Sequence, residues 1–104
     1  MKKFKVTFSK QAKKELKYII YYIKNILLEP SVAKNLLKRF NDKVISLENY
    51  PEKFPQIEKH IISNDNIRKC IVGNYIIIYQ VNTELRQVDI SHIFYAGRDW
   101  ISLL

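Results

Sequence analysis

Cysteine, glycine and proline are scarce in this sequence. The single cysteine, Cys70, cannot form a disulfide within the chain, so we expect a reducing compartment, with the cytoplasm as the default. Two glycines and three prolines leave little room for linkers or low-complexity segments. No apolar run approaches the ~20 residues of a membrane helix, and we expect neither a signal peptide nor a membrane partner.

Residues for metal, phosphate or nucleophilic chemistry are equally sparse. Two histidines, one cysteine and scattered acids do not form a metal-ligand pattern, and two isolated glycines do not form a phosphate-binding loop. Ser91 and His92 are neighbours on an expected strand and point to opposite faces, which argues against a triad with Asp89. We expect no cofactor and no metal, and interpret His60 and His92 as ordinary loop and sheet residues.

Positive charge is what the sequence has in excess. Eighteen Lys and Arg against ten Asp and Glu give a net charge of +8 over 104 residues, of which 47% are hydrophobic. This length and composition indicate one ordered globular domain, residues 1–104. The charge favours polyanions or an acidic protein as partner, although many small basic domains bind no nucleic acid.

Three consecutive strands are predicted in the last third of the chain. Alternating β-branched and aromatic residues mark them at 67–72, 75–81 and 88–95. Gly73-Asn74 predicts a tight hairpin between the first two. The middle strand is apolar on both faces, so each face needs a cover. Strict alternation along the last strand predicts that four residues share one face: Val88, Ile90, His92 and Phe94.

A short strand and two helices are predicted before this meander. Residues 4–8 alternate as a strand, Ser9 is expected to cap a helix from Gln11 to about Leu27, and Ser31 a second helix to about Asn49. Residues 50–66 are predicted as a loop, with a brief extended piece at Ile61–Ile62. The inner helical faces are predicted from apolar spacing: Ala12, Leu16, Ile19, Ile20, Ile23 and Leu27, then Ala33, Leu36, Leu37, Phe40, Val44 and Leu47.

These elements predict an α+β fold of order β-α-α-β-β-β, in which a small antiparallel sheet packs on an antiparallel helix hairpin. Basic residues near the sheet are the candidate functional groups, because cations stabilise phosphate or bind acidic partners. Each has a structural alternative. Arg68 is either a partner contact or pairs with Asp89 across the strands, and Arg98 either meets a partner or fixes the terminus through Asp99.

Several segments together resemble the RelE/ParE superfamily, the toxins of bacterial type II toxin–antitoxin modules. They are Arg68-Lys69, the strand from Gly73-Asn74-Tyr75 to Tyr79, Val88-Asp89-Ile90, and Tyr95-Ala96-Gly97-Arg98-Asp99-Trp100. The resemblance spans nearly the whole chain. It implies a toxin that arrests growth until its cognate antitoxin neutralises it, and that contacts operator DNA only through that antitoxin.

The superfamily contains two activities on one fold. RelE-like members are metal-free nucleases that cut messenger RNA in the ribosome, whereas ParE-like members inhibit DNA gyrase. Here Ile76 stands where RelE-like nucleases usually place Arg, the tail after Trp100 lacks a Tyr or His, and Tyr95 replaces a frequent His. These departures favour gyrase inhibition. The alternatives are ribosome-dependent mRNA cleavage, and a non-toxic basic module that binds nucleic acid.

The resemblance also assigns candidate site residues. Lys69, Arg98 and Tyr95 would be catalytic only if the chain is a nuclease. An acidic antitoxin would lay an amphipathic helix or strand on the toxin. The residues expected to bind this antitoxin or the target are Tyr18, Tyr21, Tyr22, Arg68, Arg98 and Trp100.

Overall fold

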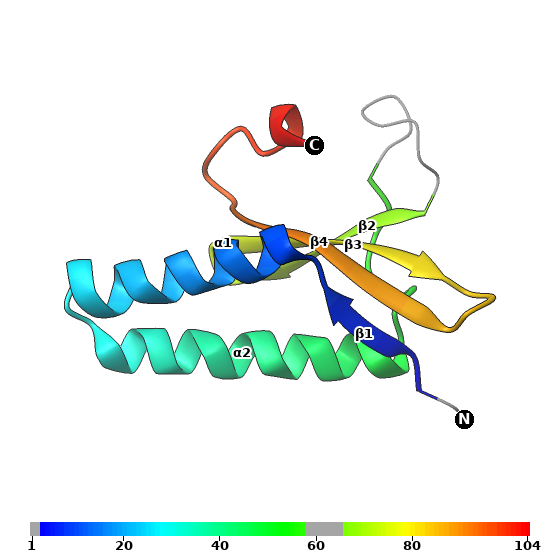
Figure 1. Ribbon diagram of the computed structural model, residues 1–104, viewed down its shortest axis with the longest axis horizontal. Helices are drawn as coiled ribbons and strands as arrows, with labels where there is room; N and C mark the ends of the chain where they lie inside the picture. The colour runs from blue at the N-terminus through cyan, green and yellow to red at the C-terminus, as the bar shows by residue number, and fades with distance from the viewer. Residues whose placement is uncertain (1–2, 58–65) are drawn as a thin grey trace.

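The computed structural model describes residues 3–57 and 66–104. Within these ranges two helices cover one face of a four-stranded sheet, in the expected order β-α-α-β-β-β (Figure 1). The expected extended piece at Ile61–Ile62, and His60, lie outside the described residues. The elements in chain order are β1 (Lys5–Phe8), α1 (Lys10–Tyr21), the π-helix η1 (Tyr22–Ile26), α2 (Pro30–Asn49), β2 (Ile67–Val72), β3 (Tyr75–Asn82), β4 (Gln87–Tyr95) and the short 3₁₀-helix η2 (Ile101–Leu103).

The sheet has the strand order β1-β4-β3-β2, and it is not antiparallel throughout. The meander β2-β3-β4 is antiparallel, as predicted, but β1 runs parallel to β4. The helix hairpin explains this correction, because it returns the chain to the end at which β1 began. There the Phe4 N–H donates to the Glu48 carbonyl at the end of α2 (2.8 Å). β2 therefore starts at the same end of the sheet as β1, on the opposite edge, and the antiparallel meander gives β4 the direction of β1.

The first helix begins as predicted and ends differently. Ser9 Oγ accepts a hydrogen bond from the Ala12 N–H (3.0 Å), which satisfies one free amide of the first turn. The α-helix stops at Tyr21 and continues as η1, after which Leu28 adopts a positive φ of 55°. α2 has Glu29 as its N-cap and Pro30 in its first turn, so the prediction of Ser31 as cap is wrong.

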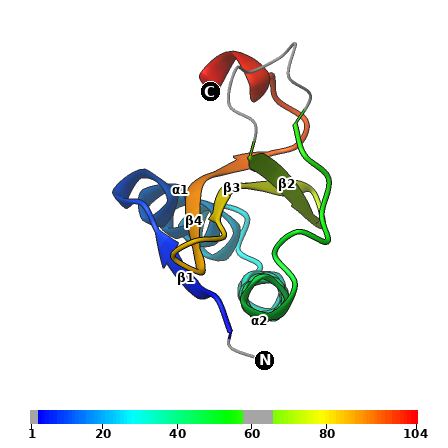
Figure 2. The same ribbon diagram turned by 90° about the vertical axis from the view of Figure 1, so that its right-hand side faces the viewer.

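The main hydrophobic core lies between the helix hairpin and the sheet (Figure 2). Leu27 and Leu37 are exposed, contrary to the predicted faces, because the apolar stripe of the hairpin is wider than its contact with the sheet. Neither helix in the described ranges combines the length and the hydropathy needed to cross a bilayer. The residues fully buried in this core include Ala12 and Leu47 of the helices and Tyr79, Val88 and Ile90 of the sheet.

A second cluster covers the outer sheet face, the one turned away from the helices. Its members Ile57, Ile76, Ile78 and Phe94 are buried, and Ile67 and Trp100 pack against them. The chain after β4 thus folds back over this face through Trp100. β3 is buried on both sides, as its sequence predicted.

Candidate functional site

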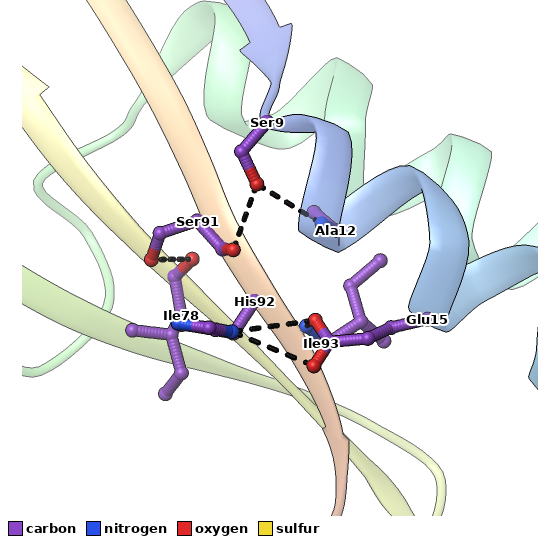
Figure 3. A network of polar contacts seen from close by, with 7 residues as sticks. All are labelled: Ser9, Ala12, Glu15, Ile78, Ser91, His92 and Ile93. Carbon is purple, nitrogen blue, oxygen red and sulfur yellow. Dashed lines mark hydrogen bonds and ion pairs between the residues drawn. The ribbon is translucent and has the colours of Figure 1, made fainter. Parts of the chain in front are cut away.

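One edge of β4 is paired with β1 along its first half and with the start of α1 after that. β1 pairs with β4 only as far as Phe8 and Ile90. Beyond that point the start of α1 takes over: the Ser9 N–H donates to the Ile90 carbonyl (2.9 Å), and Ser9 Oγ donates to the Ser91 carbonyl (2.8 Å; Figure 3). The start of α1 therefore donates hydrogen bonds to the Ile90 and Ser91 carbonyls, which a neighbouring strand would otherwise pair.

A β-bulge at Ser91 exchanges the two faces of β4. Ile78 pairs with His92 whereas Tyr79 pairs with Ile90, so Ser91 is the extra residue, and its Oγ donates to the Ile78 carbonyl (3.2 Å). Past the bulge Ile93 joins the core under the helices and Phe94 joins the outer cluster. The predicted shared face of Val88, Ile90, His92 and Phe94 is therefore wrong beyond Ile90, because the bulge shifts the alternation by one residue.

Glu15 of α1 meets the strand just past this bulge (Figure 3). Its Oε1 accepts a hydrogen bond from the Ile93 N–H (2.9 Å), and its two carboxylate oxygens lie 3.4 and 3.5 Å from His92 Nδ1. The His92 ring stacks on Phe94, with 4.7 Å between centroids. Glu15 and His92 are 77 positions apart, so sequence spacing could not pair them. The one available signal is that Glu15 is the only acid in a lysine-rich helix.

Two adjoining cavities open beside this contact, and Glu15, Tyr18 and Arg98 line both. We call the first the β4-edge hollow. It has a volume of about 370 Å³ and is lined by Gln11, Lys14, Glu15, Tyr18, His92, Phe94, Arg98 and Leu103. We call the second the tyrosine groove. It has a volume of about 510 Å³, and its lining is Glu15, Tyr18, Ile19, Tyr22, Leu27, Tyr75, Ile93, Tyr95 and Arg98.

The chemistry of this region suits an anionic group. Arg98 is exposed, and the described residues offer its guanidinium neither a hydrogen bond nor an ion pair, so its planar fork is available for a carboxylate or phosphate. The Glu15 carboxylate faces Nδ1 of His92, and the His92 ring lines the β4-edge hollow. Burial raises the pKa of Tyr75, and Tyr95 and Tyr22 raise it further, so this hydroxyl remains a neutral donor.

The structure brings together four of the residues predicted to form the site. Tyr18, Tyr22, Tyr95 and Arg98 all line the tyrosine groove. Tyr21 is exposed but lines neither cavity. The alternative role of Arg98 was to fix the terminus through Asp99. In the described ranges the Arg98 guanidinium makes no contact with the Asp99 carboxylate, and the Asp99 carbonyl accepts a hydrogen bond from Ser102 Oγ (3.1 Å).

Lys69 and Trp100 lie together at a different place, on the outer sheet face. The Lys69 ammonium is 5.8 Å from the centroid of the Trp100 ring, a cation–π contact that helps hold the C-terminal segment on the sheet. Neither residue lines the β4-edge hollow or the tyrosine groove.

Arg68 is held inside the chain's own loop. Its Nη1 donates to the carbonyls of Phe54 (2.7 Å) and Glu52 (3.2 Å), and its side chain is only 11% exposed. The suggested pairing with Asp89 is wrong, because β3 separates the two strands. Asp89 Oδ1 instead accepts bonds from Thr7 Oγ1 (2.6 Å) and Gln87 Nε2 (2.7 Å). The geometry of Arg68 is that of a loop anchor.

The described part of the chain contains no cluster of three or more His, Cys, Asp or Glu side chains that could hold a metal ion. Burial raises the pKa of Cys70, the one cysteine, which lies in the main core. Arg98, His92, Glu15 and the tyrosines are among the side chains that line the two cavities.

Comparison with known proteins gives one family match. The sequence model described as "ParE toxin of type II toxin-antitoxin system, parDE" matches residues 6–100. No curated protein matches the sequence significantly.

Solved structures of toxin–antitoxin systems share the fold at low sequence identity. The chromosomal ParDE system of P. aeruginosa contains a chain with a TM-score of 0.68 and 14% identity, over 90% of this chain and 97% of that one. The RelE–RelB complex of Pyrococcus horikoshii has a chain with a TM-score of 0.63 and 24% identity, over 91% and 97%. A chain of the Mycobacterium tuberculosis RelBE2 complex gives 0.60 and 17%, over 89% and 98%.

Proposed function

The chain belongs to the ParE toxin family of type II toxin–antitoxin systems, within the RelE/ParE superfamily that its sequence resembles, and we propose that it arrests growth by inhibiting DNA gyrase. A cognate antitoxin neutralises it in this proposal. Arg98 and the tyrosine groove form the contact with the target.

The observation that carries the choice of gyrase is the apolar character of the outer sheet face. Ile76, which stands where RelE-like nucleases usually have Arg, is 5% exposed and packs with Ile78 and Phe94. A phosphodiester in a cleavage reaction needs cations around its developing charge. At this place the described residues offer the Lys69 ammonium, which already lies over the Trp100 ring. The chain's own residues cover Ile76, so the described part of the chain offers no cationic cradle for a phosphodiester here, and this supports gyrase inhibition over RNA cleavage.

The antitoxin proposal is supported by a groove with lysines at its rim. Phe8, Leu16, Ile20 and Leu37 line a cavity of about 570 Å³ along the helix hairpin, together with Lys13, Lys14 and Lys17. An amphipathic segment with acidic flanks matches both features, since its apolar side can fill the groove while its acids meet the lysines. The ParDE, RelE–RelB and RelBE2 relatives are themselves toxin–antitoxin systems or complexes.

One observation favours the alternative of mRNA cleavage. The β4-edge hollow contains a carboxylate–imidazole contact, Glu15 with His92, beside the guanidinium of Arg98. In a nuclease, His92 would take the proton of the attacking hydroxyl while Arg98 balances the charge on phosphate. Tyr95 lines the neighbouring groove, and Lys69 contacts Trp100 instead of the hollow. This constellation keeps ribosome-dependent cleavage as the second candidate.

Expression in bacteria tests the proposal and separates the two candidates. Inducing the chain alone is expected to arrest growth, to relax plasmid supercoiling and to leave messenger RNA intact. Coexpression of the neighbouring small gene is expected to restore growth. Normal growth at verified expression contradicts the toxin assignment and favours a non-toxic nucleic-acid-binding module. Cuts in messenger RNA at codon-periodic positions, with normal supercoiling, favour the nuclease.

A further inference from the structure

The tip of the helix hairpin exposes a cluster of large apolar side chains. Leu28 is 76% exposed, and Tyr21, Ile26, Leu27 and Val32 around it are exposed as well. We call these five residues the tip patch. It lies at one end of the long axis of the molecule, in cyan, whereas the β3–β4 loop lies at the other (Figure 1). Contiguous apolar surface of this kind marks contacts with other proteins.

The backbone under the tip patch fixes the outward position of Leu28. The Leu27 N–H donates to the Tyr22 carbonyl and the Glu29 N–H to the Ile23 carbonyl, both at 2.9 Å. Leu28 lies between these two bonds with a φ of 55°, a left-handed conformation that a leucine rarely adopts. π-helices such as η1, and strained residues such as Leu28, concentrate at functional positions of proteins.

A cavity beside the tip patch offers a place for a leucine side chain. Its volume is about 440 Å³, and its lining combines apolar side chains with one acid, Glu29, and one base, Arg39. The Arg39 guanidinium lies against the β2–β3 turn, since its Nη1 would be 2.9 Å from a Cβ placed on Gly73. We call this cavity the tip hole. Its lining is Ile23, Leu27, Glu29, Val32, Asn35, Leu36, Arg39, Gly73, Asn74 and Tyr75.

We propose that the tip patch and the tip hole form a two-fold interface with a second copy of this chain. Each copy inserts Leu28 into the hole of the other, because projection and hole are neighbours on one surface, as an isologous contact requires. The same rotation brings Glu29 of one copy beside Arg39 of the second.

The charge distribution favours a second copy over an acidic partner. The residues of the tip patch and the tip hole include one acid and one base, Glu29 and Arg39, so their formal charges cancel, although the whole chain carries +8. Contact through the two tips joins the molecules at the ends of their long axes (Figure 1). The basic surfaces are thereby held apart, where salt screens their repulsion.

Sedimentation of the purified full-length chain over micromolar concentrations tests the interface. A monomer–dimer equilibrium is expected, and Leu28→Asp should weaken it by roughly tenfold to a hundredfold. Asp tolerates the left-handed conformation better than Leu, so the melting temperature should not fall. Leu85→Asp is the matched control: Leu85 is 71% exposed and lies in the β3–β4 loop, at the far end of the molecule. The control should dimerise normally.

Charge reversal tests the two-fold geometry independently. Glu29→Arg and Arg39→Glu should each weaken the dimer, and the double variant should restore it, because the pair is recreated with opposite polarity. A chain that stays monomeric at every concentration overturns the proposal, as does an equal effect of Leu28→Asp and Leu85→Asp. If the chain is monomeric and Leu28→Asp abolishes binding of the purified antitoxin, the tip patch is an antitoxin surface and the proposal is wrong.

Discussion

Two arginines with opposite environments give the sharpest mutational test of the site. Arg98→Ala removes an exposed side chain that makes no polar contact with the described residues, so the free energy of unfolding should change by about 0.5 kcal/mol or less. Arg68→Ala removes two charged hydrogen bonds and leaves the carbonyls of Phe54 and Glu52 without that donor. This should cost about 1–3 kcal/mol. The 3.7 Å ion pair to Glu52 adds little, since that acid is exposed.

The effects of the two variants on gyrase inhibition should be the reverse of their effects on stability. Arg98→Ala removes a guanidinium that pairs with the target, so this variant should inhibit gyrase roughly tenfold more weakly, or worse, than the unchanged chain. Arg98→Lys should not restore it, because an ammonium cannot copy a bidentate contact. Folded Arg68→Ala protein should inhibit normally.

The assay is a melting curve beside an inhibition titration for each variant. For a domain of this size each kcal/mol lowers the melting temperature by ~4–8 °C. If Arg98→Ala melts several degrees lower, or inhibits as well as the unchanged chain, Arg98 is not an exposed contact to the target. A stable Arg68→Ala variant without activity would instead give Arg68 the partner role first predicted for it.

Three further measurements concern the core and the β4 edge. Tyr79→Phe removes the 2.6 Å bond from the buried hydroxyl to the Pro51 carbonyl and should destabilise the chain by about 1–2 kcal/mol in denaturant unfolding; no change would mean that the loop does not depend on this bond. Burial raises the pKa of Tyr79 and Cys70, so the folded state retains protons that the unfolded state releases. Stability should therefore be intact below about pH 8 and fall as the pH rises through the alkaline range, less steeply in Tyr79→Phe; a stability that is flat up to about pH 11 would contradict this sign. Glu15→Ala leaves the Ile93 N–H without its acceptor and should cost about 1–3 kcal/mol, whereas Glu15→Gln keeps an oxygen there and should lose much less; equal losses would mean that charge matters and the hydrogen bond does not.

Local sequence signals were sufficient for most of the fold. Ser9 caps α1, Gly73 with a φ of 58° forms the tight turn between β2 and β3, and the apolar middle strand is buried on both faces. Each of these depends on residues close together in the chain. The parallel pairing of β1 with β4 depends on where the helix hairpin returns the chain, which periodicity does not encode.

The candidate site was predicted less completely, for two physical reasons. The bulge at Ser91 inserts one residue into β4, so strict alternation placed His92 and Phe94 on the wrong face. The contact of Glu15 with His92 depends on how α1 lies along the strand edge, across 77 positions of sequence. Tyr18, Tyr22, Tyr95 and Arg98 line one groove, and their binding of a partner stays a prediction. The sequence neighbours of Arg68 give no sign of the loop that encloses it, and its partner role stays a prediction.

An assay of gyrase inhibition by the purified chain is the decisive test of the proposed function. The chain is titrated into a supercoiling reaction, and in parallel into ribosomes carrying a defined message, with the cognate antitoxin added back to both. A gyrase inhibitor is expected to abolish supercoiling, with reversal by the antitoxin, and to leave the message intact. Cleavage of the message with unimpaired supercoiling would contradict gyrase inhibition and favour the nuclease, for which Glu15, His92 and Arg98 in the β4-edge hollow are the candidate groups.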